Sequence, residues 1–341
     1  MGEEILLQQN YLGADVLQTI YFGGGTPSLL DKEELQFLLE VVFQTHRVNT
    51  DAEITLEANP DDLTLLKLRD FKAVGINRLS IGIQSFDDGI LKYLHRAHLS
   101  ETAIHAVALS REAGFDNISI DLIYAIPGMS LAEWGNTIEK ALSLQPEHLS
   151  AYTLTIEEKT TFGNWFAKGK LLPIDETLAA EQQEILMTSL ASAGYRQYEI
   201  SNFAKPGFES RHNSGYWKGE KYLGIGPSAH SYDQISRQHN VSNNHQYVRA
   251  LREGKIPSAS EVLKRSDRIN EYILTSLRTD TGCNMELLKR DFDYDLLTVH
   301  REYIRSLQNH NLVSLQSSHL ALTEAGRLLA DKISSDLFLI E

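Results

Sequence analysis

The chain has 341 residues, with 46 Asp and Glu against 32 Lys and Arg, so its formal net charge is −14 at pH 7. This length suffices for one large or two ordinary domains without disulfide support. The acidic charge disfavours nonspecific binding to nucleic acid or to anionic membranes, because both need clustered Lys and Arg.

Two further features concern the compartment. The one cysteine, Cys283, cannot form an internal disulfide and is typical of a reducing environment. Residues 1–10 lack the basic start and apolar core of a secretory signal, and no segment approaches the ~18 apolar residues of a membrane helix. We therefore expect a cytoplasmic protein with no membrane span.

Short β-branched runs alternate with helical patterns along the first half of the chain. The runs that we predict as strands are 19–22, 53–57, 78–83, 118–123 and 148–154. Capped helical patterns lie between them, for example after Asp31 and after Ser130. This alternation predicts right-handed crossovers and a parallel sheet, either doubly wound or curled into a full or partial barrel. Both forms bind ligands at the carboxyl ends of the strands.

The second half has a different character. Residues 155–260 are rich in aromatic and turn residues, and we interpret them as an extension of the sheet. From about residue 266 the pattern is helix, helix, hairpin, helix, which is similar to a winged helix. We expect a barrel core at 1–160, an extension at 161–260 and a winged-helix-like α+β domain at 261–341. Since basic and acidic residues are mixed along the last helices, we expect no nucleic-acid partner.

Polar or glycine-rich groups occur at the ends of the first four predicted strands. They are Gly23-Gly24-Gly25-Thr26, Glu57-Ala58-Asn59, Gln84-Ser85 and Asp121. The glycines let a ligand approach the backbone amides closely, but the lysine of a Walker phosphate loop is absent. One such group alone is most often structural, whereas four together favour a ligand-binding rim. Arg96 could add a carboxylate clamp or be an exposed helix arginine.

These segments resemble the oxygen-independent coproporphyrinogen III oxidase-like branch of the radical S-adenosylmethionine (SAM) proteins. The resemblance covers nearly the whole chain and is clearest at 21–28, 57–60, 79–86, 121–124 and 322–326. It implies an α/β fold with a partial (β/α)6 TIM-type barrel that binds SAM at its rim. By matching position, the implied SAM-binding residues are Gly24, Gly25, Thr26, Glu57, Gln84, Arg96, Asp121, Ile123 and Thr155.

The segment His212-Asn213-Ser214-Gly215-Tyr216-Trp217 is similar to the signature of the heme-chaperone members of that family (HemW type). The resemblance implies that His212 binds heme iron and that Tyr216 and Trp217 contact the porphyrin. A neutral imidazole is a good iron ligand, and aromatic rings pack on a porphyrin face. A histidine beside Tyr-Trp, taken alone, is more often simply packed or hydrogen-bonded. Either His230 or His239 could be a second ligand.

The family motif Cys-x3-Cys-x2-Cys, whose thiolates hold a [4Fe-4S] cluster, does not occur in this sequence. One thiolate cannot replace three, so the chain as written should not cleave SAM reductively. The chain is then either truncated at its N-terminus, with the first barrel strand also missing, or a natural variant that lost the cluster. We interpret Cys283 itself as a small buried hydrophobe.

Two weaker patterns remain. Residues 224–229 match a dinucleotide fingerprint by letters only, because no helix follows Pro227. His95, His98 and His105 have the spacing of one helical side, but no cysteine or carboxylate pair completes a metal site.

Three functions stay open. The leading hypothesis is a heme-binding chaperone or carrier that serves heme-accepting proteins, with a homodimer left open. The second is an oxygen-independent coproporphyrinogen III dehydrogenase of porphyrin biosynthesis, which requires the three cysteines of a longer N-terminus. The third is a cluster-less SAM-binding protein.

Overall fold

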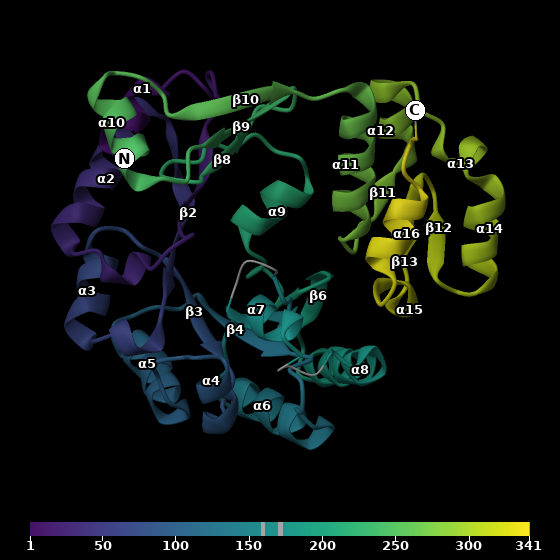
Figure 1. Cartoon of the computed structure of the whole chain (residues 1–341), viewed down its shortest axis with the longest axis horizontal. Coiled ribbons are helices and arrows are strands. Elements are labelled where there is room, and N and C mark those ends of the chain that lie inside the picture. The colour runs from purple at the N-terminus through teal and green to yellow at the C-terminus, as the bar shows by residue number, and fades with distance from the viewer. Residues whose placement is uncertain (158–160, 170–172, 341) are drawn as a thin grey trace. The chain divides into compact units, whose positions relative to one another are not determined.

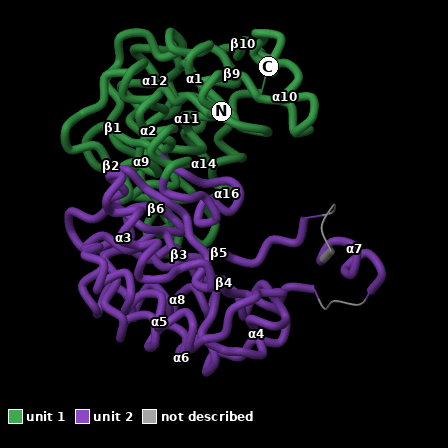
Figure 2. The backbone as a smooth tube through the Cα atoms, turned by 90° about the vertical axis from the view of Figure 1, so that its left-hand side faces the viewer, with its two compact units in different colours: residues 1–20, 33–52, 210–341 green, residues 21–32, 53–209 purple. Residues whose placement is uncertain are grey.

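A computed structural model of the chain describes residues 1–157, 161–169 and 173–340 (Figure 1). The chain divides into two compact units, which Figure 2 shows in different colours. Unit 1 comprises residues 1–20, 33–52 and 210–341, and unit 2 comprises residues 21–32 and 53–209. The domain boundaries that the sequence suggests near residues 160 and 260 stay a prediction.

Unit 2 alternates strands and helices. Its helices are η1 (Pro27–Leu29), η2 (Pro60–Asp62), α3 (Leu65–Ala73), α4 (Asp88–Tyr93), α5 (Ser100–Glu112), α6 (Leu131–Ser143), α7 (Thr161–Ala167) and α8 (Glu176–Ser192). Its own strands are β3 (Arg78–Gln84), β4 (Ile118–Tyr124), β5 (His148–Thr153), β6 (Arg196–Glu199) and β7 (Asn202–Ala204). Strands β1 (Leu17–Phe22) and β2 (Val48–Ala58) begin in unit 1 and end in unit 2.

These strands form one sheet in the order β1-β2-β3-β4-β5-β7-β6. Strands β2 to β5 are parallel neighbours, whereas β7 pairs antiparallel with β5 and with β6. The parallel part confirms the sheet predicted from the strand–helix alternation. Strands β6 and β7 confirm that the sheet extends beyond residue 155.

Alternate residues of the central strands lie on opposite faces of the sheet. On β3, Leu79, Ile81 and Ile83 are fully buried, as expected for a parallel sheet that helices cover. The intervening positions are polar: the Ser80 hydroxyl donates to the carboxylate of Asp121 on β4 at 3.2 Å. This side of the sheet, called the polar face below, carries the predicted ligand-binding groups.

Helix α6 shows how local sequence sets an element. Ser130 caps the helix: its hydroxyl accepts from the Glu133 N–H at 3.2 Å, and the Glu133 carboxylate accepts from the Ser130 N–H at 2.7 Å. Trp134 is fully buried, and its Nε1 donates to the Gln182 carbonyl of α8 at 2.8 Å. The capping box predicted at Ser130 is thus confirmed, and Trp134 anchors the helix.

Unit 1 contains the remaining elements. Its helices are α1 (Gly2–Leu7), α2 (Lys32–Thr45), α9 (Arg211–Trp217), α10 (Asn244–Arg252), α11 (Arg265–Leu277), α12 (Met285–Phe292), α13 (Leu296–Val299), α14 (Arg301–Asn309), α15 (Glu324–Arg327) and α16 (Ala330–Asp336). Its own strands are β8 (His230–Tyr232), β9 (Ser236–Asn240), β10 (Ser258–Val262), β11 (Cys283–Asn284), β12 (Val313–Gln316) and β13 (His319–Leu322).

A buried carboxylate ties α1 into unit 1. Glu4 is fully buried and accepts hydrogen bonds from the Gly226 N–H at 2.8 Å, from the Asn240 side-chain amide and from the Tyr247 hydroxyl. These partners follow Glu4 by 222 to 243 residues in the sequence. A buried carboxylate needs such donors, because its charge is costly to remove from water.

The aromatic segment departs from the prediction in one respect. Strands β8, β9 and β10 form a separate three-stranded sheet, in the order β10-β9-β8, and do not extend the main sheet. The cause is a local hairpin: Asp233 Oδ1 accepts from the Ile235 N–H at 2.9 Å in the turn between β8 and β9.

The C-terminal part confirms the predicted order of helices and hairpin. Strands β12 and β13 form the hairpin, and β11 adds to it in the order β11-β13-β12. Cys283 lies in β11, in a strand where we predicted helix, and it is fully buried. Burial raises the pKa of its thiol to about 12. The interpretation of Cys283 as a small buried hydrophobe is confirmed.

Candidate functional site

The glycine turn after β1 is the first part of the candidate rim on unit 2. Gly24 has a φ of +76°, a left-handed conformation that favours glycine. A Cβ atom placed on Gly24 or Gly25 would meet nothing within 4 Å, so the backbone is open to a ligand there. A Cβ on Gly23, in contrast, would lie 2.5 Å from the Tyr21 ring and 2.8 Å from Glu57 Oε1. Gly23 lets the turn pack on the end of β2, and its two neighbours leave room for a ligand.

Glu57, near the end of β2, organises this turn. Its Oε1 accepts from the Tyr21 hydroxyl at 2.7 Å, and its Oε2 accepts from the Gly24 N–H at 3.2 Å. Burial, followed by the charge of Glu57, raises the pKa of Tyr21. The sequence analysis assigned no role to Tyr21, although its place two residues before Gly23 was a usable signal.

Arg96 lies just after α4 and not on a helix, and it is half-buried. Its Nη2 donates to Asn59 Oδ1 at 2.8 Å and to the Gly82 carbonyl at 3.0 Å. A Cβ on Gly82 would lie 2.9 Å from Gln84 Nε2 and 3.4 Å from Arg96 Nη2. A side chain at position 82 would therefore crowd both predicted ligand groups, Gln84 and Arg96. Glycine at this position leaves room for their side chains beside β3. The alternative of an exposed helix arginine is wrong.

Asp121 occupies the polar face on β4. Both of its carboxylate oxygens lie 3.2 Å from the Ser80 hydroxyl. Burial raises the pKa of Asp121 to about 6, with the charge of Glu57 acting in the same direction, while hydrogen bonds from Ser150 and Ser80 oppose the shift. Burial also lowers the pKa of Arg96, although the charge of Asp121 acts against that shift. Asp121 is therefore close enough to interact electrostatically with both Glu57 and Arg96.

The other predicted SAM residues are less closely joined to this set. Ile123 is half-buried on β4, and it pairs with Tyr152 of β5. Thr26 and Thr155 are exposed, and the Thr155 hydroxyl makes only a long hydrogen bond of 3.5 Å to the Thr153 carbonyl. The structure brings together Gly24, Glu57, Gln84, Arg96 and Asp121 and leaves Thr26 and Thr155 at the margin.

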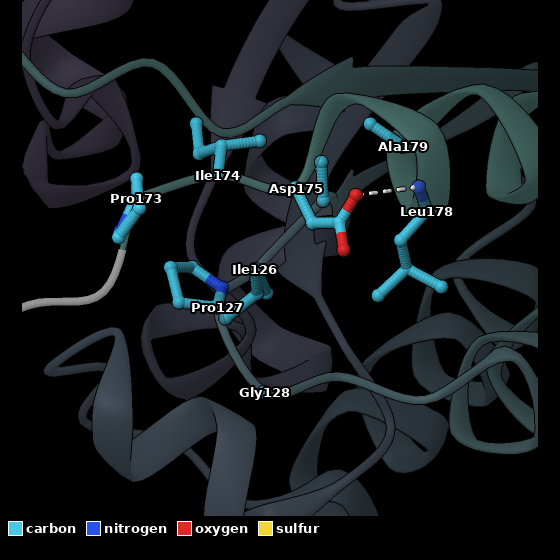
Figure 3. A pocket seen from close by; sticks show the side chains of 9 residues that line it. Ile126, Pro127, Gly128, Pro173, Ile174, Asp175, Leu178 and Ala179 are labelled. Carbon is cyan, nitrogen blue, oxygen red and sulfur yellow. Dashed lines mark hydrogen bonds between the residues drawn. The ribbon is translucent and has the colours of Figure 1, made fainter.

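A pocket of about 440 Å³ lies at the end of β4 (Figure 3). Its lining is mainly apolar and consists of Ala125, Ile126, Pro127, Gly128, Pro173, Ile174, Asp175, Leu178 and Ala179. Asp175 turns its carboxylate to the start of α8, where Oδ1 accepts from the Leu178 N–H at 3.1 Å. The predicted SAM-binding residues lie outside the lining of this pocket. It therefore adds no polar group to the rim.

His212 lies on α9 in unit 1. Ser210 caps this helix by accepting from the Asn213 N–H at 3.2 Å, and Arg211 pairs with Asp51 at 3.3 Å. The Nδ1 atom of His212 lies 3.2 Å from Thr19 Oγ1 on β1. A ring held at Nδ1 by a hydrogen bond is oriented so that Nε2 can act as a metal ligand. The sequence analysis did not find Thr19, which lies 193 residues away.

A series of aromatic rings packs one against the next, beginning at His212. The Tyr216 ring packs edge-on against His212 at 4.9 Å and against Tyr222 at 4.7 Å, and Tyr222 lies 6.0 Å from Tyr232. Tyr216 is 40% exposed, so part of this residue is accessible to a ligand.

Trp217 is packed differently. The Arg278 guanidinium lies 5.1 Å from its ring centre. Its buried Nε1 has no hydrogen-bond partner within the described residues.

The histidines of unit 2 do not form the arrangement that their spacing suggested. His95 has a φ of +55° after the end of α4, His98 is buried before α5, and only His105 is helical. His98 Nε2 lies 3.0 Å from the Ile83 carbonyl oxygen, within hydrogen-bond distance, so this ring has a structural contact. In the part of the chain that the structure describes, no three His, Cys, Asp or Glu side chains are placed to hold a metal ion. None of the described helices combines the length and the apolar character needed to cross a membrane.

Sequence comparisons assign both ends of the chain. Residues 3–141 match the Radical SAM superfamily, and residues 263–329 match the HemN C-terminal domain. A protein named heme chaperone HemW from Bacillus subtilis is 36% identical over 323 residues, which cover 94% of this chain and 85% of the relative. The protein of the same name from Lactococcus lactis is 35% identical over 317 residues, covering 93% and 83%.

A solved structure is similar over almost the full length. Coproporphyrinogen III oxidase (HemN) from Escherichia coli, described as a radical SAM enzyme, superposes with a TM-score of 0.83 at 22% identity. The match covers 99% of this chain and 81% of the other. This likeness confirms the predicted fold class, an α/β protein with a partial barrel.

Proposed function

The chain belongs to the HemW-type proteins of the radical SAM superfamily, and from this membership we propose that it is a heme chaperone, which binds heme reversibly and passes it to acceptor proteins. His212 is the proposed ligand of the heme iron. The observation that carries the proposal is the 3.2 Å contact of its Nδ1 with Thr19 Oγ1. A histidine oriented through one ring nitrogen offers the other nitrogen to iron.

The porphyrin contact is proposed for Tyr216 and Trp217. Tyr216 supports this because its ring is partly exposed directly beside His212. Trp217 follows on the same helix, and the cation of Arg278 covers its ring.

For unit 2 we propose a SAM-binding rim. The open backbone at Gly24 and Gly25 fits a ligand that approaches closely, with Glu57, Gln84 and Asp121 as partners of its amino and ribose groups. Arg96, Thr26, Ile123 and Thr155 complete the proposed set, Arg96 as the partner of the SAM carboxylate.

SAM serves radical chemistry when it is bound beside an iron–sulfur cluster. The residues of this chain include one cysteine, the buried Cys283, which does not fit the three-thiolate set that such a cluster needs. We therefore derive no step through a cluster.

Transfer of heme tests the chaperone proposal. The full chain is loaded with one equivalent of hemin, and unbound hemin is removed. The loaded chain is then mixed with apomyoglobin, and the Soret band of myoglobin is compared with that of the loaded chain. We expect the band of the loaded chain to be replaced by that of myoglobin. Complete retention of heme would contradict a carrier, and failure to load any heme would contradict heme binding itself.

A further inference from the structure

Two histidines face each other across the β8–β9 hairpin of unit 1. His230 and His239 are paired positions of these antiparallel strands. Their ring centroids lie 5.8 Å apart, with 30° between the ring planes, and both residues are exposed. Directly opposed residues project from the same face of a sheet, so the two imidazoles reach solvent side by side.

The opposite face of this small sheet is occupied by structural contacts. Gln238 Nε2 donates to Gln8 Oε1 of α1 at 2.7 Å, and Asn240 donates to Glu4 of the same helix. On the face of the histidine pair, Arg237 pairs with Glu271 of α11 at 2.8 Å and lies over the ring of Tyr232. Neither imidazole ring forms a hydrogen bond or an ion pair within the described residues. No hydrogen bond or ion pair within the described residues therefore accounts for two histidines at these positions.

The backbone beneath the pair is fixed from both sides. Strand β9 lies on one edge of β8, and residues 222–224 lie on the other. Tyr222 and Tyr232 exchange two backbone hydrogen bonds of 2.9 Å, and the Gly224 N–H donates to the Ser231 hydroxyl at 3.0 Å. A Cβ atom on Gly224 would collide with the His230 backbone, so a glycine is needed for this approach. The two rings are thus presented from a rigid support.

We propose that His230 and His239 form a transition-metal site that binds one Zn²⁺, Ni²⁺ or Cu²⁺ ion through both imidazoles. Imidazole is a preferred ligand of these ions. Since no third His, Cys, Asp or Glu completes the set within the described residues, water fills the remaining coordination positions. A site with open positions exchanges its ion or its other ligands, unlike a closed structural site.

The alternative that either His230 or His239 alone is a second ligand of heme iron stays a prediction. The rings of Tyr216, Tyr222 and Tyr232 follow one another between His212 and β8. The site is therefore separate from that of His212 and does not depend on the heme proposal.

Calorimetric titration of the heme-free, tag-free full chain with Zn²⁺, repeated with Ni²⁺, tests the site. We expect saturable binding of one ion per chain. His230→Gln and His239→Gln should each weaken binding by at least the roughly tenfold loss that removal of an outer-sphere partner already causes. His245→Gln is the matched control, because His245 is an exposed histidine on α10, away from the pair.

The same variants can also overturn the proposal. Unchanged affinity in either His230→Gln or His239→Gln would overturn a two-imidazole site. Equal weakening by His245→Gln would show general surface binding and would overturn it as well. Circular dichroism should match the wild type in all three variants, since each replaced side chain is exposed. His212→Ala should keep the Zn²⁺ affinity whether or not His212 binds heme.

Discussion

Replacing Thr19 with valine removes the hydroxyl that contacts His212 and keeps the shape of the side chain. The two atoms lie 3.2 Å apart, and Thr19 is half-buried. When Nδ1 carries the proton and donates it to the hydroxyl, Nε2 keeps its lone pair for iron. One such hydrogen bond contributes about 0.5–1.5 kcal/mol. Thr19→Val should therefore weaken hemin binding by roughly two- to thirteenfold.

Two measurements check this prediction. A hemin titration followed in the Soret region gives the affinity of wild type and variant. Nitrogen-edited NMR of the heme-free protein gives the protonated nitrogen of the His212 ring, which we expect to be Nδ1 in the wild type. Thr19→Val should shift this proton towards Nε2. Thr19→Ser retains a hydroxyl and should resemble the wild type in both measurements.

An unchanged ring tautomer in Thr19→Val, together with unchanged hemin affinity, would refute the role of Thr19. A changed tautomer with unchanged hemin affinity would support the hydrogen bond between Thr19 and His212 in the wild type. It would also show that His212 does not bind the heme iron. Near-wild-type circular dichroism is expected, because threonine and valine are both β-branched residues that favour strands and Thr19 lies near the start of β1.

Three other predictions concern buried or rim carboxylates. Glu57→Gln should weaken SAM binding about 13- to 160-fold, since hydrogen bonds to a charged group contribute about 1.5–3 kcal/mol; equal SAM affinity by calorimetry would show that the rim assignment is wrong. Glu4→Ala should lower the free energy of unfolding in urea by several kcal/mol, because three buried neutral donors lose their acceptor and each unsatisfied donor costs about 1–3 kcal/mol; a loss below about 1 kcal/mol would contradict this. The raised pKa of Asp121, about 6, means that the folded state binds a proton more tightly than the unfolded chain, so this group stabilises the fold below pH 4 and loses that contribution as the pH rises to 6. Asp121→Asn should flatten this fall in unfolding free energy between pH 4 and 6, and an unchanged slope would place the carboxyl pKa near its ordinary value.

The elements that local pattern determines could be predicted from the sequence. Strand β3 follows from the β-branched and apolar run at residues 78–83, and the start of α6 follows from Ser130 and Glu133. Both depend on residues that are near neighbours in the chain, where periodicity and capping chemistry act directly.

Long-range partners could not be predicted in the same way. Thr19 meets His212 across 193 residues, and Glu4 meets Tyr247 across 243 residues. Nothing in the local pattern of either residue names its partner. The separate sheet of β8 to β10 was missed for a related reason: short strands in a turn-rich segment do not reveal which sheet they join.

The candidate site was predictable as a set of positions and not as a geometry. The ends of β2 to β4 lie at one edge of the sheet because these strands are parallel, and ligand binding at this edge stays a prediction. Only the structure shows the hydrogen bonds within this set. They join Tyr21 to Glu57, Ser80 to Asp121, and Arg96 to Asn59.

Ligation of heme iron by His212 is tested most directly by a hemin titration of the full chain, wild type and His212→Gly, with and without added imidazole. We expect the wild type to bind one hemin per chain with a saturable Soret band. His212→Gly should lack this band, and free imidazole should restore it by occupying the vacated place. An unchanged Soret band and affinity in His212→Gly would contradict His212 as the iron ligand.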